Sequence, residues 1–426
     1  MRQKIIVVGP AYSQTGYGEQ CRFALRALLA HDKLFDVYLK PINWGNSSWL
    51  LPNDSDRDWL DNLVRKTAIH LQGGGASFDV SLQVTIPNEW ERIAPLNIGY
   101  TAGIETTKVA PEWLQQSGLM DRIITISNHS KSVFVETVYN AVVEETGAST
   151  TLRCTTPIDV VHYPVRLYDS PELELDLEYD FNYLTVSQWG PRKNLENTIR
   201  WWIEEFADQE VGLVVKTNLI KTSIIDRMHT LERLEHIARL YPDRKCKIYM
   251  LHGNMTAAEM MGLYQHPKIK CLVSLTHGEG FGLPLFEAAY NALPIVAPNW
   301  SGHTDFLYAM KKKRKKGKTV KKNHPHFAQV EYNLAPVPPE AVWEGVIQPD
   351  SLWCYPKESS YKETIRKVYD NYRFFEKQAE SLKSSILKRH TPEEKYAEFV
   401  ESVWPSKDRE ILNEIEEMFK DLSVDA

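Results

Sequence analysis

The chain has 426 residues, which exceeds the usual size of one compact core, so we expect two domains. Its apolar content of 43%, charged content of 25% and net charge of −6 are typical of a soluble globular protein. It has no apolar run of roughly 18 residues, and the apolar segment at its start (MRQKIIVVGP) is too short for a signal peptide. Its five cysteines lack the spacing of a disulfide framework or a zinc site. We therefore expect a cytoplasmic protein with reduced thiols and no transmembrane segment.

The first strand is predicted at residues 5–8, where an apolar run ends at a Gly-Pro pair. Residues 12–18 (YSQTGYG) then form a glycine-containing loop that leads into a helical pattern. Open α/β sheets bind ligands outside the carboxyl ends of their strands, so Gly16 and Gly18 are candidates for ligand contact. Turn chemistry alone would also explain these glycines.

Further apolar runs at residues 78–84, 96–103 and 122–128 alternate with helical patterns, one of which spans residues 130–145. This alternation predicts a parallel sheet with helices on both faces. The polar residues 100–107 follow one of these strands and are candidates for lining a cleft.

The spelling Asp54-Ser55-Asp56 matches an Asp-x-Asp metal motif. It precedes a helical pattern near Arg57, where acidic residues suit the positive end of the helix dipole. We therefore interpret it as a helix start and predict no metal site.

We place a first domain at residues 1–165, an acidic linker at 166–180, a second domain at 181–400 and a helical tail at 401–426. Four apolar residues recur in the tail at helical spacing and predict a packing stripe: Ile411, Ile415, Phe419 and Leu422.

The second domain opens with a strand at residues 183–187 and a Gly-Pro turn, followed by Arg192 and Lys193 at the start of a helix. Two cations at a helix start oppose its dipole, so they either face an anion or occupy an exposed helix end. A second apolar run ends at Lys216, and a third is followed by Gly253 and a capped helix.

The most informative stretch is residues 277–288, HGEGFGLPLFEA, which joins a strand pattern to a helix-forming run. Its glycines let backbone approach a ligand closely, and Pro284 suits the first turn of a helix. The free N–H groups of that turn are a ready site for a phosphate. Glu279 and Glu287 would be repelled by a phosphate, so hydroxyl groups are their better partners. A ligand with a diphosphate and many hydroxyls is a nucleotide sugar.

This stretch resembles the Glu-x7-Glu signature of retaining glycosyltransferases of the GT-B fold, in particular the large family 4. The resemblance rests on Gly-Glu-Gly-Phe-Gly-Leu-Pro followed by Glu-Ala. The alternative is a strand-to-helix turn whose glycines serve packing alone. The resemblance implies an α/β protein with two Rossmann-like, doubly wound parallel sheets that face a cleft. The N-terminal domain would bind the acceptor, the C-terminal domain the donor, and the last helices would cross back to the first domain.

The resemblance also assigns roles to single residues. Lys193 stands at the family's phosphate-binding lysine, whereas Gln188 replaces the usual arginine and Arg192 is a candidate to restore that charge. Glu279 would hold the hydroxyls of the sugar and Glu287 those of the ribose. Further donor contacts are implied for Gly16, Gly18, Lys216, Gly253, Asn254, Met255, Gly280, Phe281, Gly282 and Leu283.

The reaction so implied is a retaining, metal-independent transfer from a UDP- or GDP-type sugar to a hydroxyl, without a cofactor. Fixed cations and N–H dipoles would stabilise the charge that gathers on the leaving phosphate. Neither His277 nor His129 stands out as a general base. Family members often activate the acceptor through the departing phosphate.

Residues 311–322 (KKKRKKGKTVKK) carry nine Lys or Arg and no acid. Such a run is often a solvated loop, but it can also bind a polyanion. It lacks the apolar helical spacing of a membrane-binding segment, which favours nucleic acid. Some phages glycosylate hydroxymethylated bases of their DNA with GT-B enzymes. We therefore predict a DNA acceptor held by Lys311, Lys312, Lys313, Arg314, Lys315 and Lys316.

Other functions remain open. A cell-envelope polysaccharide or lipid is the alternative acceptor. A binding protein without turnover and a GT-B epimerase, which needs no acceptor, are alternatives to a transferase, although Glu279, Lys193 and Glu287 argue against a silent binding protein.

Overall fold

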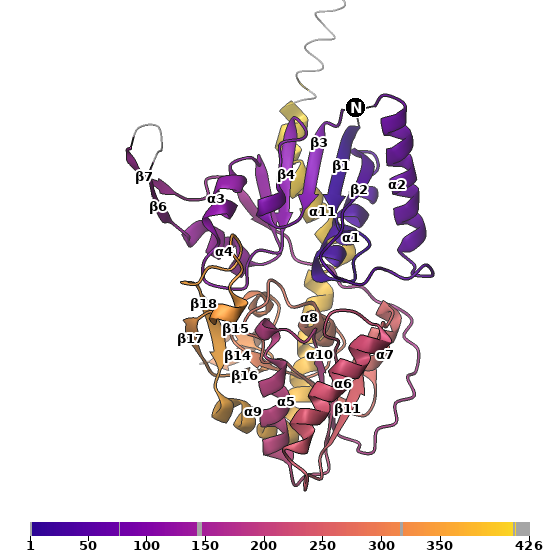
Figure 1. The fold of residues 1–426 in the computed structure, drawn as a ribbon, viewed down its shortest axis with the longest axis vertical. Coiled ribbons are helices and arrows are strands. Elements are labelled where there is room, and N and C mark those ends of the chain that lie inside the picture. The colour runs from indigo at the N-terminus through magenta and orange to yellow at the C-terminus, as the bar shows by residue number, and fades with distance from the viewer. Residues whose placement is uncertain (1, 76, 143–146, 316–317, 412–413, 415–426) are drawn as a thin grey trace, which may run out of the picture.

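The computed structural model describes residues 2–75, 77–142, 147–315, 318–411 and 414, with residues 311–315 and 318–321 described by their backbone alone. The molecule has two halves, and each is built on a six-stranded parallel sheet with helices on its faces (Figure 1). The predicted fold class of two doubly wound parallel sheets is confirmed.

The first sheet has the strand order β2-β1-β3-β4-β5-β8. Ile5 and Val7 of β1 and Leu82 of β3 are fully buried, as expected for a parallel sheet covered by helices. The strands are β1 (Gln3–Gly9), β2 (Phe35–Pro41), β3 (Val80–Val84), β4 (Leu96–Thr101), β5 (Arg122–Thr125) and β8 (Ile158–Val160). The helices are α1 (Gly16–Leu29), α2 (Arg57–Gln72), η1 (Pro87–Glu89), α3 (Pro111–Ser117) and α4 (Asn128–Glu136).

The second sheet has the strand order β11-β10-β9-β12-β13-β16. Its strands are β9 (Asn182–Val186), β10 (Gly212–Lys216), β11 (Lys247–Leu251), β12 (Ile269–Val273), β13 (Ile295–Pro298) and β16 (Ala328–Val330). Its helices are α5 (Leu195–Phe206), α6 (Ile224–Arg239), α7 (Ala257–Gln265), α8 (Leu283–Tyr290) and α9 (Glu358–Asp370). Trp202 and Phe206 of α5 are fully buried and cover one face of this sheet.

The helix expected over residues 130–145 is wrong at residues 137–142, because α4 ends at Glu136, and residues 143–145 lie outside the described residues. The backbone turns extended at Thr137, with ψ of 124°. It continues as β6 (Tyr139–Val142), which pairs antiparallel with β7 (Ser149–Leu152). The β-branched and aromatic residues after the helix favour a strand over the helical spacing that the sequence also shows.

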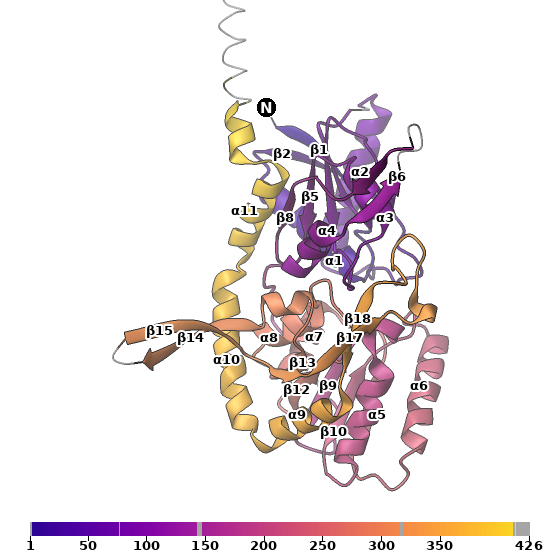
Figure 2. The same cartoon turned by 90° about the vertical axis from the view of Figure 1, so that its left-hand side faces the viewer.

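The last helices connect the two halves. α10 (Tyr372–Arg389) lies along the second half, and α11 (Pro392–Val403) packs on α1 of the first half (Figure 2). The ring centroids of Phe399 and Phe23 are 5.2 Å apart in this contact. The predicted return of the C-terminal helices to the first half is therefore confirmed. The predicted domain boundary at residue 400 falls inside α11.

The tail beyond α11 contributes little to the described structure. Ile411 of the predicted packing stripe is exposed, and Ile415, Phe419 and Leu422 lie outside the described residues. None of the helices in the described ranges is long and apolar enough to cross a membrane.

A second connection runs between β17 (Tyr332–Pro336) and β18 (Leu352–Pro356). Val346 of this segment is 5% exposed and packs with buried tryptophans of the first half. The side-chain amide of Asn88 donates to the carbonyl of Gly345 at 3.0 Å. The halves are therefore tied both by the crossing helices and by this segment.

The described residues of the basic run form the antiparallel strands of a hairpin rather than the expected loop. Its strands, β14 (Tyr308–Lys315) and β15 (Lys318–Pro325), project from the body beside α10 (Figure 2). In its register Lys311 pairs with Lys322, and like charges placed opposite each other weaken a two-stranded ribbon that is already marginal. Among the residues predicted to bind a polyanion, Lys316 lies outside the described residues.

Candidate active site

The stretch singled out in the sequence lies where the strand order of the second sheet reverses, between β9 and β12. Loops that follow such neighbouring strands diverge and leave a crevice at their carboxyl ends. The loop after β9 contains η2 (Pro191–Lys193), and the loop after β12 runs through residues 274–282. The first half closes over this place, because a Cβ on Gly278 would lie 2.5 Å from the carbonyl oxygen of Glu105.

Glu279 is the centre of a buried ionic cluster. It is 8% exposed, and Nζ of Lys193 donates to its Oε1 at 2.5 Å. Nη1 of Arg192 lies 3.4 Å from Oε2 of Glu279 and donates to the carbonyl of Gly278 at 2.6 Å. The structure therefore brings together Lys193, Arg192 and Glu279, to which the sequence analysis gave phosphate-binding and sugar-binding roles.

The two cations keep Glu279 ionised in spite of its burial. Burial raises the pKa of Glu279, but the charges of Lys193 and Arg192 outweigh it and lower that pKa to about 2. Burial and the neighbouring Arg192 together lower the pKa of Lys193. The site is thus charged before any ligand arrives, and a ligand must take over partners that already exist.

The start of α8 has the features of a phosphate site. Gly282 precedes it with a φ of 93°, a left-handed conformation that favours glycine, and Pro284 lies in the first turn. Gly282 has no side chain to cap this helix end. The backbone N–H groups of Leu283 and Leu285 in the first turn, where Pro284 has none, are therefore suited to bind an anion.

A turn after β13 supports the central loop. The side-chain oxygen of Ser301 accepts a hydrogen bond from the backbone N–H of Glu279 at 2.9 Å, and the N–H of Gly302 donates to the carbonyl of Glu279 at 2.9 Å. A Cβ on Gly302 would lie 1.9 Å from the carbonyl oxygen of Gly280. Ser301 has a φ of 75°, a strained conformation that persists only where the surroundings fix it.

His303 in this turn was not identified from the sequence. It is 1% exposed, its Nε2 lies 2.7 Å from the carbonyl oxygen of Pro298, and its Nδ1 has no partner among the described residues. Nε2 must carry the hydrogen to donate to a carbonyl, so Nδ1 presents a lone pair. Burial lowers the pKa of His303, which keeps the ring neutral.

Glu105, in the loop after β4, brings a charge from the first half into the site. Its Oε1 lies 3.2 Å from Nη2 of Arg192. Burial lowers the pKa of Arg192, but the charges of Glu105 and Glu279 outweigh burial, so the pKa of Arg192 is raised. The sequence analysis had placed Glu105 only within the polar segment 100–107, because no spacing reveals a pair that spans two domains.

The glycine loop after β1 lies at the edge of the site. The hydroxyl of Tyr17 accepts a hydrogen bond from the N–H of Ala102 at 3.3 Å. A Cβ on Gly18 would lie 1.9 Å from the carbonyl oxygen of Ser13, whereas Gly16 has open space where a Cβ would stand. Gly18 therefore serves the packing of the loop, and Gly16 is the glycine with room for a ligand.

A network of acids and arginines lies behind this loop. Glu19 pairs with Arg26 at 3.0 Å and with Arg166 at 2.9 Å, and Asp56 pairs with Arg26 at 2.6 Å. Arg166, from the extended linker, is thereby fixed to the first half. Asp56 of the Asp-x-Asp spelling precedes α2 and belongs to this network. No group of three or more His, Cys, Asp or Glu within the described ranges could hold a metal ion.

Glu287 lies on α8 and faces Tyr264 of α7, whose hydroxyl donates to its Oε2 at 2.9 Å. Burial raises the pKa of Glu287 to about 7, although the hydrogen bond from Tyr264 and the charge of Arg166 lower it. Near neutral pH this carboxyl can therefore both donate and accept hydrogen bonds. That property suits a hydroxyl of a ligand.

Lys216 ends β10, and its Nζ donates to the carbonyl of Gly253 at 2.6 Å. This contact holds the loop after β11, where Gly253 has a φ of 109° and is followed by Asn254 and Met255. Gln188 donates to a backbone carbonyl after β10 at 2.7 Å. β10 and β11 lie on the opposite side of β9 from β12, the strand whose loop carries Glu279.

Phe281 occupies the core rather than the crevice. It is 2% exposed, and its ring centroid lies 5.1 Å from that of Tyr163 and 4.9 Å from that of Phe306. Its side chain joins the cores of the two halves, which leaves only its backbone to meet a ligand.

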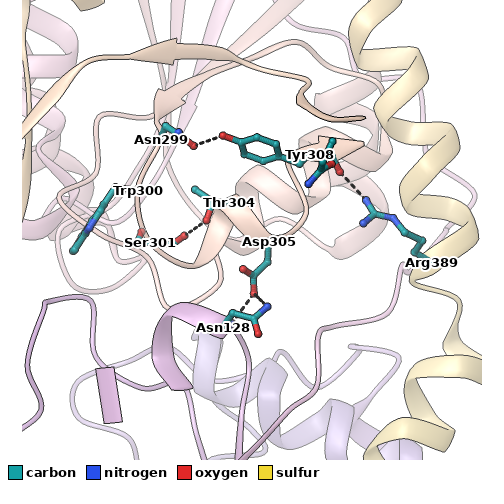
Figure 3. Close-up of a pocket in the computed structure, with 9 residues that line it drawn as sticks. Asn128, Asn299, Trp300, Ser301, Thr304, Asp305, Tyr308 and Arg389 are labelled. Atoms are coloured by element: carbon teal, nitrogen blue, oxygen red, sulfur yellow. Dashed lines mark hydrogen bonds between the residues drawn. The ribbon is translucent and has the colours of Figure 1, made fainter. Parts of the chain in front are cut away.

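A polar pocket of about 540 Å³ lies between the halves, beside the turn after β13 (Figure 3). Asp305 joins the halves there, because its Oδ2 accepts from the backbone N–H of Asn128 at 2.7 Å and lies 2.9 Å from Nε2 of His162. The residues that line this pocket come from separate segments, so no single stretch of sequence predicts the pocket. We call it the seam pocket, and it is lined by Asn128, Asn299, Trp300, Ser301, Thr304, Asp305, Tyr308, Asn323 and Arg389.

No protein-family model matches the sequence, and a search of curated proteins finds no match. Solved structures do match. Sucrose-phosphate synthase from Thermosynechococcus elongatus superposes with a TM-score of 0.56 and 12% identity over 100% of both chains. Anabaena HepE, solved in complex with UDP-glucose, gives a TM-score of 0.58 and 12% identity over 94% of this chain and 99% of its own. A glycosyltransferase from Rickettsia africae gives a TM-score of 0.54 and 12% identity over 95% of this chain and 100% of its own.

These likenesses and the two six-stranded parallel sheets define the class of protein: the chain has the two-domain α/β fold called GT-B. At such low identity the likeness establishes the fold alone.

Proposed function

We propose that this protein is a glycosyltransferase that moves a sugar from a nucleotide diphosphate sugar to a hydroxyl group. The observation that carries the proposal is the grouping of Lys193, Arg192 and Glu279 beside the start of α8. Cations and free N–H groups suit a diphosphate, and a buried carboxylate suits the hydroxyls of a sugar. HepE, which has the same fold, binds UDP-glucose in its crystal structure, and this supports a donor of that class.

Donor binding would exchange internal partners for ligand groups. The diphosphate replaces Glu279 as the partner of Lys193 and Arg192, and Glu279 then accepts hydrogen bonds from the sugar. Glu287, with a pKa near neutrality, bonds the ribose hydroxyls. We assign the base to the loop that begins at Gly253, whose carbonyl accepts a hydrogen bond from Lys216.

In the transfer step, the bond between the anomeric carbon and the phosphate oxygen breaks, and the acceptor oxygen bonds to that carbon. The leaving diphosphate gains negative charge, which Lys193, Arg192 and the N–H groups of α8 stabilise. The acceptor's proton passes to a phosphate oxygen on the same face of the sugar, so the anomeric configuration is retained. This route, inferred from the family 4-like spacing of Glu279 and Glu287, needs no separate base and no metal ion.

A hydroxymethylated base in DNA is one candidate acceptor. The observation that favours it is the run of nine Lys or Arg in residues 311–322, carried on a hairpin that projects from the body (Figure 2). Such a ribbon would meet a polyanion with an affinity that falls as salt rises. An envelope saccharide or lipid is the other candidate.

A matrix of donors and acceptors tests the proposal. The protein is incubated with UDP- and GDP-sugars and with duplex DNA containing hydroxymethylcytosine or envelope fragments, and the products are analysed by mass spectrometry and NMR. We expect release of the nucleotide diphosphate, a sugar's mass added to one acceptor, and a retained anomeric configuration. Nucleotide bound without turnover indicates a silent binding protein, and an altered sugar without an acceptor indicates an epimerase.

A further inference from the structure

Asp226, in the first turn of α6, joins two loops at the carboxyl edge of the second sheet. Its Oδ1 accepts from the backbone N–H of Leu219 at 2.9 Å, and its Oδ2 accepts from the N–H groups of Ile220 at 2.7 Å and Lys221 at 2.9 Å. Nε2 of His252, directly after β11, lies 2.8 Å from the same Oδ1. Asp226 therefore connects the loop after β10 to the loop after β11.

The Asp226–His252 pair is buried and fixed. Only 2% of the side chain of His252 and 8% of that of Asp226 are exposed. Burial raises the pKa of Asp226, but the hydrogen bonds from His252 and from three backbone N–H groups outweigh burial, so that pKa is lowered. Asp226 is therefore ionised, and His252 must carry a hydrogen on Nε2 in order to donate to it.

Helix capping alone does not explain this arrangement. Ser223 already caps α6, because its hydroxyl oxygen accepts from the N–H of Asp226 at 3.2 Å. In the capping box of α7, by contrast, the acid Glu259 bonds back to the N–H of Thr256 in its own helix end at 2.7 Å. Asp226 stands at the same helical position, but its two oxygens bond to the neighbouring loop and to His252. Its role is therefore to join loops.

The loop that Asp226 holds also contacts the loop after β9. The side-chain amide of Gln188 donates to the carbonyl of Leu219 at 2.7 Å, and the N–H of Trp189 donates to a backbone carbonyl of the loop after β10 at 2.8 Å. The loop after β9 carries Lys193. A chain of contacts therefore runs from the cation proposed for the diphosphate to Asp226.

We infer that Asp226 and His252 are positioning residues for the nucleotide, because they fix the loop that begins at Gly253 against the base. This inference rests on the proposed function, since it concerns the donor of the proposed reaction. His252 immediately precedes Gly253, where the backbone turns with a φ of 109°. The bond from His252 to Asp226 thus sets the start of the loop assigned to the base. The pair acts on the base and leaves the diphosphate contacts of Lys193 as they are.

Calorimetric titrations of UDP, UMP, GDP and GMP into the full chain test this inference. His252→Phe keeps a ring but cannot donate to Asp226, and His252→Gln supplies an amide that can donate. His236→Phe, at an exposed position of α6, is the matched control. Urea unfolding shows whether each variant is folded, and His252→Ala replaces His252→Phe if the larger ring prevents folding.

We expect His252→Phe to raise the Kd of the preferred diphosphate about tenfold or more and to reduce the selectivity between UDP and GDP. The ratio of Kd values between monophosphate and diphosphate should stay within about twofold, because the phosphate contacts remain. His252→Gln should recover most of the affinity, and the control should bind like the wild type.

Two results would overturn the inference: wild-type affinity in folded His252→Phe, or loss of the preference for the diphosphate over the monophosphate in that variant. The second result would show that the pair acts on the phosphate contacts instead of the base. Failure of every nucleotide to bind the wild type would reject the proposed function and this inference together, whereas the first two results reject the inference alone.

Discussion

At the scale of single residues, Glu279 shows how a buried acid is kept ready for a polar ligand. Burying a charge without partners is costly, and Lys193, Arg192 and the backbone contacts of the turn after β13 offset that cost. Lys193 and Arg192, which pair with Glu279 in the free protein, are the cations that would bind a diphosphate. The site therefore favours a ligand that supplies both an anion for the cations and hydroxyls for Glu279.

Replacing Lys193 with methionine should impair the transfer step. We expect kcat/KM to fall by about 100-fold or more, because one fixed cation is lost where the phosphate charge develops. Steady-state release of nucleotide measures the effect, and unfolding curves show whether the variant is folded. Lys407→Met, at an exposed lysine, is the control. A fall of less than about threefold in the folded variant would show that Lys193 does not stabilise the leaving group.

Glu287 should make stability depend on pH. Its pKa is raised from 4.5 to about 7, so the folded protein holds this proton more tightly than the unfolded chain. Ionisation of this carboxyl therefore lowers the free energy of unfolding as pH rises from about 4.5 to about 7, by at most about 1.4 kcal/mol per pH unit. Glu287→Gln removes this loss.

Urea unfolding at several pH values measures this effect. The stability of Glu287→Gln relative to the wild type should increase by about 2 kcal/mol between pH 5 and pH 7. A difference that stays constant across this interval would mean that Glu287 titrates normally.

The turn after β13 should tolerate no side chain at Gly302. Gly302→Ala places a Cβ 1.9 Å from the carbonyl oxygen of Gly280, so the central loop must move. We expect a loss of about 1–3 kcal/mol in the free energy of unfolding together with weaker nucleotide binding. Gly16→Ala, which meets open space, is the matched control for stability alone. Equal stability of the two variants in urea would show that the turn adapts.

Much of the candidate site could be predicted because its residues are close in sequence or directly follow strands. The stretch 277–288 contains the glycines, the proline and the acids of the site. Lys193 lies in the loop after β9, the strand next to β12 in the sheet. Glu105 and His303 could not be predicted, because their roles arise from contacts between distant segments. Phe281 was assigned to the donor, but its ring fills the core, since a motif does not reveal which way a side chain points.

At the scale of elements, the hairpin of β14 and β15 is separable from the rest of the fold. Replacing every Lys and Arg of residues 311–322 with Ser or Gln should leave the urea midpoint nearly unchanged, because a projecting ribbon buries little. Binding to heparin or duplex DNA should weaken strongly and lose most of its salt dependence. Unaltered polyanion binding would place the anion site elsewhere on the molecule.

The strands of both sheets could be predicted where apolar runs end at turns, as at residues 5–8 and 183–187. Prediction failed where two preferences compete. Residues 139–142 carry a helical spacing of apolar residues, but their β-branched and aromatic side chains pair as β6. The basic run has the composition of a loop, and only pairing along its length makes it a hairpin.

At the scale of the whole molecule, two connections and several polar contacts span the halves, among them the ion pair of Arg192 with Glu105. α10 and α11 form one connection, and Val346 anchors the other. Between them Arg192 bridges Glu279 and Glu105. A diphosphate that draws Arg192 away from Glu105 would alter the contact between the halves, and we therefore expect donor binding to be coupled to that contact.

The most direct test of the donor site is a calorimetric titration of UDP, UMP, GDP and GMP into the wild type and Lys193→Met. We predict that one diphosphate binds at least about tenfold more tightly than its monophosphate, and that Lys193→Met removes this difference. Equal affinity for mono- and diphosphates, or a preference that survives in Lys193→Met, would contradict a diphosphate site built on Lys193, Arg192 and α8.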